Sequence, residues 1–389
     1  MFLRLLFYYI IEKQIKGEVI MKKVFALILS AVIIISAAGC GSKAEEGSNE
    51  QETTAQASKA ETLGEEVKKQ LDQALDDVEY SGVVQITKNG DVIYTYVDGD
   101  DSNGKPLTAG ASLPVGSVSK QFCAACVMYL CEQNKLSLED TLDRFFPNFK
   151  DGKKITVKQL LNMSSGLTNY LELLKPTMVT DNESKNISAI TKLITDQTPR
   201  FEPGQDYEYS NSNYFLLAGI VEQASGIAYH KFLREQFFVP LEMNDTGFIE
   251  EIPDAEWASA LSADELKNEY HYRPGVTRGA GDVVSNAADM EKWMRGLSEG
   301  KVISVDSFRQ MTESVNPYSD EEYCFGLWHM PFGGFGHVGQ IPPFFGAVDY
   351  INTERGICLF AVSNYGRGMS YVQQLPDELL EILFDEKSE

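Results

Sequence analysis

Segments with the composition of β-strands lie near both ends of this chain, and a long, mainly helical stretch separates them. Near the start, two runs rich in β-branched residues flank Asn89-Gly90, a dipeptide typical of a two-residue hairpin turn. The runs expected to form strands are Val83 to Thr87, Val92 to Val97, Cys324 to His329, Phe344 to Asn352 and Ile357 to Val362. Strands at both ends predict one sheet assembled from both termini. We therefore expect an α+β fold, with an antiparallel sheet flanked by helices and an inserted, mainly helical subdomain.

Apolar residues at helical spacing predict helices before, between and after these strands. The first is expected from Leu63 to Val78 and the last from Leu375 to Phe384. Central helices are expected at Phe122 to Leu130, Val157 to Met163, Tyr214 to Ala224 and Ala287 to Leu297.

The first 40 residues have the pattern of an export signal. Met21-Lys22-Lys23 precedes an apolar run from Val24 to Ala38, which Gly39-Cys40 follows. The small residues before Cys40 resemble a bacterial lipobox, in which the cysteine sulfur carries a lipid, and Met21 is the expected initiator. A plain signal peptide and a transmembrane anchor near the N-terminus are the alternatives. We expect an exported protein that its lipid holds at the extracytoplasmic face of the cell membrane.

Residues 41–62 are dominated by small and polar residues and contain no aromatic side chain. Such a segment cannot bury enough apolar surface to fold, so it predicts a flexible linker. The expected organisation is a signal and lipoprotein segment over residues 1–40, a linker over 41–62 and one folded domain over 63–385.

The charge of the chain argues against one class of partner. The formal net charge is -23 at pH 7, and so acidic a surface repels nucleic acid. The four histidines lack the spacing of metal ligands, so no metal site is expected. Cys123 and Cys126 lie in an apolar helical run and are expected to be buried free thiols rather than a redox pair.

Ser117-Val118-Ser119-Lys120 is the strongest catalytic pattern. A serine hydroxyl needs a base, and a lysine three residues later on a helix can hold its amine beside that hydroxyl. Ser-x-x-Lys occurs three times, but the copies at 102–105 and 298–301 contain glycine and do not begin a helix. Only Ser117 follows a glycine and precedes a long apolar helix. The pattern predicts Ser117 as nucleophile and Lys120 as its base.

Two further short patterns supply polar groups. Tyr209-Ser210-Asn211 lies in a polar loop before a helix, where a phenol can relay protons and an amide can hold a carbonyl or the lysine amine. His337-Val338-Gly339 follows a glycine-rich run, which would let a substrate approach a strand edge whose N–H groups bind an oxyanion. Each pattern is weak evidence for a catalytic site when taken alone, and the order of the patterns along the chain makes the evidence stronger.

In that order, Ser-x-x-Lys, Tyr-x-Asn and His-x-Gly resemble the signature of the β-lactamase-related serine hydrolases, in the branch of class C β-lactamases, D-Ala-D-Ala carboxypeptidases and related esterases. Leu160 to Leu167, Phe201 to Tyr214 and Gly279 to Ser285 also resemble segments of this family. The resemblance covers roughly residues 65 to 385. In this family variable loops shape the pocket, here at 168–200 and 248–278.

The resemblance implies an acyl-enzyme mechanism on a peptide, amide or ester, without a cofactor. Ser117 would attack the carbonyl, with Lys120 as base or proton relay and Tyr209 activating the nucleophile or the deacylating water. Asn211, His337, Gly339 and Gln340 would contact the substrate, and the N–H groups of Ser117 and Gln340 would form the oxyanion hole.

Two departures from the family pattern bear on the substrate. His337 stands where true β-lactamases have lysine, which favours an esterase or peptidase over an efficient β-lactamase. Pro342-Pro343 replaces the usual Pro-Gly, and Arg367 is a further candidate for the missing cation. The alternative is a catalytically silent lipoprotein of the same fold that binds cell-wall fragments or penicillin. A stress or assembly lipoprotein without a small-molecule site is a third interpretation.

Overall fold

The structure is a computed structural model that describes residues 63–101, 103–249, 269–320, 322–341, 345–364 and 375–384. Two compact units divide the chain, residues 1–58 and 59–389, and every described residue lies in the second. The predicted signal segment, Cys40 and the linker lie outside the described residues, as do Pro342, Pro343 and Arg367. Within the described ranges, no helix is long and apolar enough to cross a membrane.

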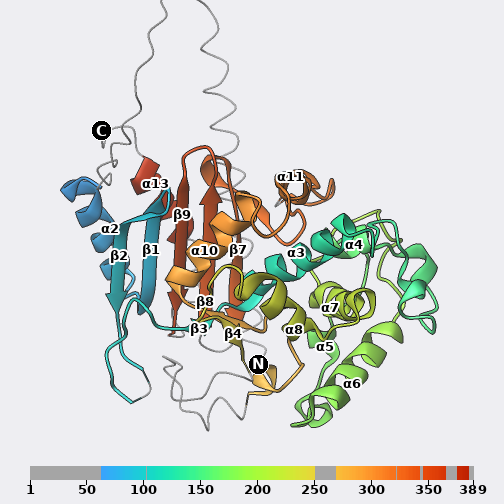
Figure 1. The fold of residues 1–389 in the computed structure, drawn as a ribbon. Helices are drawn as coiled ribbons and strands as arrows, with labels where there is room; N and C mark the ends of the chain where they lie inside the picture. The colour runs from blue at the N-terminus through green and yellow to red at the C-terminus, as the bar shows by residue number, and fades with distance from the viewer. Residues whose placement is uncertain are drawn as a thin grey trace, which may run out of the picture. The chain divides into compact units, whose positions relative to one another are not determined.

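A six-stranded antiparallel sheet joins the two ends of the domain, in the order β2-β1-β9-β8-β7-β6 (Figure 1). Its strands are β1 (Gly82–Lys88), β2 (Asp91–Asp98), β6 (Trp328–Met330), β7 (Gly334–Ile341), β8 (Phe345–Asn352) and β9 (Ile357–Ser363). The N-terminal strand β1 pairs directly with the C-terminal strand β9, from Gly82↔Ser363 to Lys88↔Ile357. The predicted α+β fold, with a sheet built from both termini, is confirmed.

Helices cover both faces of this sheet. On one face, α2 (Glu65–Asp77) and α13 (Leu375–Phe384) pack over alternate residues of β1, such as Val84 and Ile86. On the other, α3 (Ser119–Glu132) and α10 (Ala287–Ser298) belong to a larger core that includes Val83. Every residue of β8 and β9 is buried, because these central strands are covered on both sides.

The helical region lies between β2 and β6 in the chain. Most of it lies beside the sheet in space, whereas α10 lies over one face of the sheet (Figure 1). Its helices are α3, α4 (Val157–Leu161), α5 (Tyr170–Leu173), α6 (Glu183–Thr195), α7 (Asn211–Ser225), α8 (Tyr229–Leu233), α10 and α11 (Val305–Glu313). Shorter helical segments are η1 (Gly116–Val118), η2 (Leu142–Arg144), η3 (Gly152–Lys154), η4 (Pro176–Met178), the π-helical η5 (Arg234–Phe238), η7 (Tyr270–Tyr272) and η8 (Pro331–Gly333). A small sheet, β3-β5-β4, is formed by Leu113–Pro114, Val283–Ser285 and Gly247–Phe248.

Local sequence explains several boundaries. Ser210 caps α7 by accepting the N–H of Ser212, and Thr156 forms a capping box with Gln159 at the start of α4. Asn89 and Gly90 both have positive φ, 52° and 92°, as the predicted two-residue hairpin turn between β1 and β2 requires.

Two expectations need correction. The run from Cys324 to His329 was expected to be a strand, but β6 begins only at Trp328. The N–H of Cys324 donates to the carbonyl of Leu327 at 2.8 Å, so the first part of the run closes a tight turn. The segment 168–200, expected as a loop, contains α5 and α6, and the Asn182 side chain caps α6 by accepting the N–H of Lys185.

Candidate active site

Ser117 lies in η1, the single turn directly before α3. The sequence predicted that Ser117 precedes a long apolar helix, and the α-helix begins two residues after it, at Ser119. The Ser119 hydroxyl oxygen accepts the N–H of Val283, which ties the start of the helix to β5. The turn carrying Ser117 is therefore anchored on a fixed helix rather than on a free loop.

Lys120 brings three segments of the chain together at its amine. Nζ lies 2.9 Å from Oγ of Ser117, 2.8 Å from Oδ1 of Asn211 and 2.7 Å from the carbonyl oxygen of Ala280. The side chain is fully buried. The structure thus places the predicted base within hydrogen-bond distance of the predicted nucleophile.

Burial lowers the pKa of the Lys120 amine well below its usual range, because a buried ammonium loses its hydration. A neutral amine has two N–H groups and one lone pair. Asn211 and Ala280 offer only oxygen acceptors to it, so they take both N–H groups. The lone pair is then left for the hydroxyl proton of Ser117, which is the arrangement that a general base needs.

Asn211 and Tyr209 reach the lysine from the start of α7. The Nδ2 group of Asn211 donates to Oδ1 of Asn169 at 3.4 Å, which turns its oxygen towards Lys120. Lys120 Nζ lies 5.0 Å from the ring centre of Tyr209. That ring stacks on Trp328, with centroids 5.9 Å apart and planes at 12°. Tyr209 is therefore held beside the lysine by packing against β6.

His337 is fully buried beside Trp328, with ring centroids 4.1 Å apart. Its Nδ1 lies 2.7 Å from the carbonyl oxygen of Val338 and donates to it, which leaves Nε2 as an acceptor. Burial lowers the pKa of the imidazole well below its usual range. His337 is therefore neutral at pH 7 and does not supply a cation, and Nε2 has no hydrogen-bond partner among the described residues.

Strand β7 runs against the turn that carries Ser117. A Cβ atom added to Gly339 would overlap the carbonyl oxygen of Val115 and lie 2.9 Å from the N atom of Ser117. A Cβ added to Gly116 would lie 2.7 Å from the N atom of Gln340. Glycine at both positions allows this close approach, so the main-chain N atoms of Ser117 and Gln340 lie near each other.

A cavity of about 280 Å³ opens beside Ser117. Of the residues predicted to act on the substrate, Ser117, Asn211 and Gln340 line it. Its other walls are Tyr170, Leu171, Tyr270, His271, Thr277, Ala280, Gly281 and Ile341. Lys120 and His337 are buried behind this lining. The described walls are mostly aromatic, aliphatic or neutral polar groups.

Three of these features were not assigned a role from the sequence. They are the Ala280 carbonyl that accepts from Lys120, the Asn169 amide that orients Asn211, and the Trp328 ring that supports Tyr209 and His337. A signal existed only for Ala280, which lies in the family-like turn from Gly279 to Ser285. Main-chain acceptors and supporting rings leave no motif of their own.

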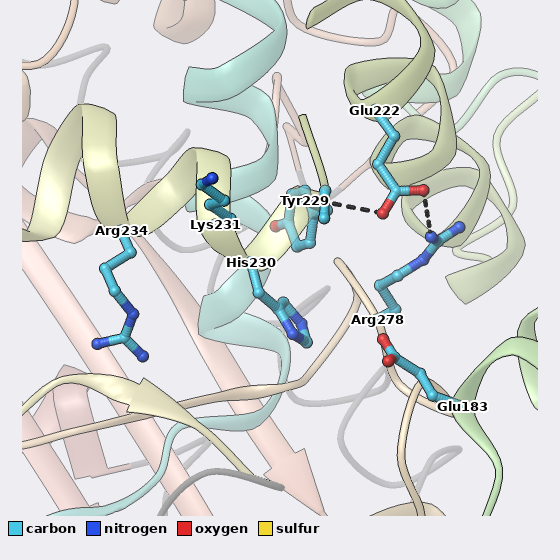
Figure 2. A pocket seen from close by; sticks show the side chains of 8 residues that line it. Glu183, Glu222, Tyr229, His230, Lys231, Arg234 and Arg278 are labelled. Atoms are coloured by element: carbon cyan, nitrogen blue, oxygen red, sulfur yellow. Dashed lines mark hydrogen bonds and ion pairs between the residues drawn. The ribbon is translucent and has the colours of Figure 1, made fainter. Parts of the chain in front are cut away.

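A second cavity, of about 290 Å³, lies near α8 (Figure 2). Figure 2 shows the Glu222 carboxylate between the main chain of Tyr229 and the guanidinium of Arg278, with Arg234 on the opposite side. Arg278 Nη1 donates to Glu222 at 2.7 Å, and His230 Nε2 lies 2.7 Å from Asp282. Within this lining Glu222 pairs with Arg278, and the described lining contains no serine or cysteine.

Comparison with known proteins gives a consistent relationship. The Beta-lactamase family matches residues 67–384. A penicillin-binding protein of Bacillus subtilis (strain 168) is 27% identical over 332 residues, which cover 79% of this chain and 73% of that protein. A D-aminopeptidase of Brucella ovis is 28% identical over 276 residues, 67% of this chain and 52% of that protein. This chain therefore spans about half the length of the D-aminopeptidase.

Solved structures share the fold. The crystal structure of D-amino acid amidase from Ochrobactrum anthropi SV3, complexed with L-phenylalanine amide, superposes with a TM-score of 0.70 at 24% identity. The match covers 83% of this chain and 99% of the amidase. The family match extends over most of the chain and includes Ser117, Lys120, Tyr209, Asn211 and His337. The chain belongs to the β-lactamase family of serine hydrolases.

Proposed function

We propose that this serine hydrolase cleaves amide bonds of small peptides or amino-acid amides through an acyl-enzyme on Ser117. The observation that carries the proposal is the buried Lys120 amine, 2.9 Å from the Ser117 hydroxyl and held by two acceptors on its other sides. Relatives named D-aminopeptidase and D-amino acid amidase support an amide or peptide substrate.

In the acylation step, Lys120 Nζ takes the hydroxyl proton while Oγ of Ser117 bonds to the substrate carbonyl carbon. The carbonyl oxygen becomes an oxyanion, and the N–H groups of Ser117 and Gln340 stabilise it. The C–N bond then breaks, and the leaving amine takes the proton from Lys120, with Tyr209 as a relay. Water attacks the resulting ester by the same route, which releases the acid and frees Ser117.

The cavity walls suggest what the acyl group carries. Tyr170, Leu171, Tyr270 and Ile341 offer apolar surface beside Ser117. Burying an apolar side chain there would contribute about 1.5–3 kcal/mol to binding. We therefore assign neutral, apolar or aromatic acyl groups to this cavity. Esters of the same acids would react by the same steps.

Efficient β-lactam hydrolysis is not part of the proposal. A lysine at the third motif would offer a positive charge to a substrate carboxylate, whereas His337 is neutral and lies behind the cavity lining. The expected outcome with penicillin is slow acylation of Ser117 with little turnover.

The N-terminal pattern supports a proposal about location as well. The signal-like run before Cys40 would direct export, and a lipid on Cys40 would hold the enzyme at the outer face of the cell membrane. Metabolic labelling with an alkyne fatty acid in the native host would test it. Label and membrane association should both be lost in Cys40→Ala, and an unlabelled wild-type protein would argue for a plain signal peptide.

The first experiment is intact-protein mass after exposure to a fluorophosphonate and, separately, to penicillin. An adduct that disappears in Ser117→Ala would identify the nucleophile. Folded wild-type protein without any adduct would favour the silent binding protein instead.

The second experiment measures turnover of D- and L-phenylalanine amide, glycine amide and a matched methyl ester. The proposal predicts kcat/KM for the phenylalanine amides about 10-fold or more above that for glycine amide, since a buried apolar side chain contributes about 1.5 kcal/mol or more. If the protein hydrolyses the ester and none of the amides, it is an esterase rather than an amidase.

A further inference from the structure

Asp349 lies on β8 directly across from His337 on β7, and its side chain is 1% exposed. Its Oδ1 atom accepts the main-chain N–H of His337 at 2.9 Å. Its Oδ2 atom accepts Nε2–H of Gln121 at 2.8 Å. One buried carboxylate therefore links the strand that carries Gln340 to the helix that carries Lys120.

Gln121 has a fixed orientation in this link. Its Oε1 atom accepts the indole N–H of Trp293 at 2.8 Å, and an indole nitrogen can only donate. The amide nitrogen of Gln121 must therefore face Asp349. Trp293 is itself held by stacking on Phe122, with centroids 4.0 Å apart. The line of contacts runs from α10 through α3 to β8 and β7.

Both partners of Asp349 are neutral donors, which only a carboxylate satisfies with both of its oxygens. Burial raises the pKa of this carboxyl to about 7, so its ionised form is costly in the folded protein. A buried charge that lowers stability is a feature expected at functional sites. Asp349 lies beside such a place, because β7 and the Ser117 turn are packed so closely that neither Gly116 nor Gly339 has room for a Cβ atom.

We propose that Asp349 is a positioning residue that fixes β7 against α3, and thereby holds the Gln340 N–H in register with Ser117 and Lys120. The proposal rests on the acyl-enzyme function proposed above. A shift of about 1 Å between reacting groups can cost about 100-fold in rate, so this spacing matters to catalysis.

The chain offers a charge exchange that tests the link. In Asp349→Asn only one side-chain oxygen remains, so either His337 N–H or Gln121 Nε2 loses its acceptor. The double variant combines Asp349→Asn with Gln121→Glu. Its new carboxylate at position 121 accepts from Trp293 and from the new amide at position 349, whose oxygen accepts from His337. Every hydrogen bond is then restored, with the charge moved to position 121. Gln121→Glu alone places two carboxylates face to face.

The measurement is the second-order rate of fluorophosphonate labelling of Ser117 in the full-length purified protein, with the unfolding midpoint recorded for each variant. Both single variants should label roughly 10- to 100-fold more slowly than wild type, and the double variant should return to within about threefold. A matched control is Asp289→Asn, which changes another buried carboxylate that accepts hydrogen bonds, from Asp245, Thr246 and Lys292. The control should lower the unfolding midpoint and leave the labelling rate of the folded protein unchanged.

Two results would overturn the positioning role. One is a wild-type labelling rate in folded Asp349→Asn, and the other is a double variant that regains stability without regaining rate. Absence of labelling in wild type would count against the proposed function instead. Amide hydrogen exchange over residues 334–341 then still decides the positioning role, which requires faster exchange in Asp349→Asn and recovery in the double variant.

Discussion

The amine nitrogen of Lys120 lies 2.9 Å from the hydroxyl oxygen of Ser117, one turn away on the same helical segment. The side-chain oxygen of Asn211 and the main-chain carbonyl oxygen of Ala280 accept hydrogen bonds from the same amine. The base proposed for Ser117 is therefore desolvated and fixed in orientation, and each of these two properties can be tested separately.

Replacing Lys120 by methionine should remove the base and keep most of the side-chain volume. We expect labelling of Ser117 by a fluorophosphonate to slow by roughly 100- to 10,000-fold, the usual range for loss of a general base. Stopped labelling reactions read by intact mass would measure it. Lys301→Met is the matched control, since Lys301 is 58% exposed and belongs to the Ser-x-x-Lys copy that ends a helix. An unchanged rate in Lys120→Met would remove Lys120 from the mechanism.

The pH dependence of wild type should report the lowered pKa of Lys120. The rate of Ser117 labelling should rise with pH and level off well below pH 10, because the amine loses its proton earlier than an ordinary lysine. Between that lowered pKa and the ordinary value, the folded protein binds fewer protons than the unfolded chain, so stability rises with pH. Lys120→Met should lack this rise when unfolding midpoints are compared from pH 6 to 10. A labelling rate that climbs steadily to pH 10 would contradict a neutral lysine.

Tyr209→Phe should separate the phenol from the packing of its ring. Phenylalanine keeps the stacking on Trp328, so the unfolding midpoint should change little. We expect turnover to fall roughly 100-fold, as for loss of a proton relay. Burst kinetics with an ester substrate would show which step slows. The opposite pattern, a large loss of stability with normal turnover per folded molecule, would make Tyr209 a packing residue only.

The sequence predicted the sheet well because its strands are long, apolar and bounded by turn residues. Val83, Ile86 and the Asn89-Gly90 turn indicated the hairpin from local composition alone. The strand prediction was wrong at Cys324, because an apolar run that closes a turn has the same composition as one that forms a strand. The motif residues Ser117, Lys120 and Asn211 could be predicted to meet because the family pattern orders them along the chain.

Asp349 and Ala280 could not be predicted as parts of the site in the same way. In the sequence Asp349 looks like an interruption in a buried strand. Its importance follows from its partner His337 on the neighbouring strand β7, and only the register of the sheet reveals this pairing. Ala280 contributes a main-chain oxygen, for which side-chain identity carries no information. The neutrality of His337 also depends on burial that a three-residue motif does not show.

Gly339→Ala should damage the site through its shape. An added methyl group would overlap the carbonyl oxygen of Val115, so β7 must move away from the Ser117 turn. We expect a loss of about 1–3 kcal/mol in the free energy of unfolding and a fall of about 100-fold in kcat/KM. Gly110→Ala is the control, because the nearest atom to its added methyl would be 4.0 Å away. Urea unfolding and amide hydrolysis, measured on both variants, would check it, and equal activities would show that β7 tolerates the shift.

Asp349→Asn should also change how stability depends on pH. Burial raises the pKa of this carboxyl from 3.8 to about 7, so between these values the folded protein holds a proton that the unfolded chain has released. The contribution of Asp349 to stability is therefore full below pH 4 and is lost as the pH rises through 7. In Asp349→Asn this loss disappears, so the free energy of unfolding should fall less from pH 4 to 8 than in wild type, by an amount on the order of a few kcal/mol. Denaturant unfolding of both proteins across this range isolates the difference, since the other titrating groups are common to both. Parallel pH curves would mean that the pKa of Asp349 is the same in the folded and the unfolded protein. Ionisation of the carboxylate that links β7 to α3 would then not lower the free energy of unfolding.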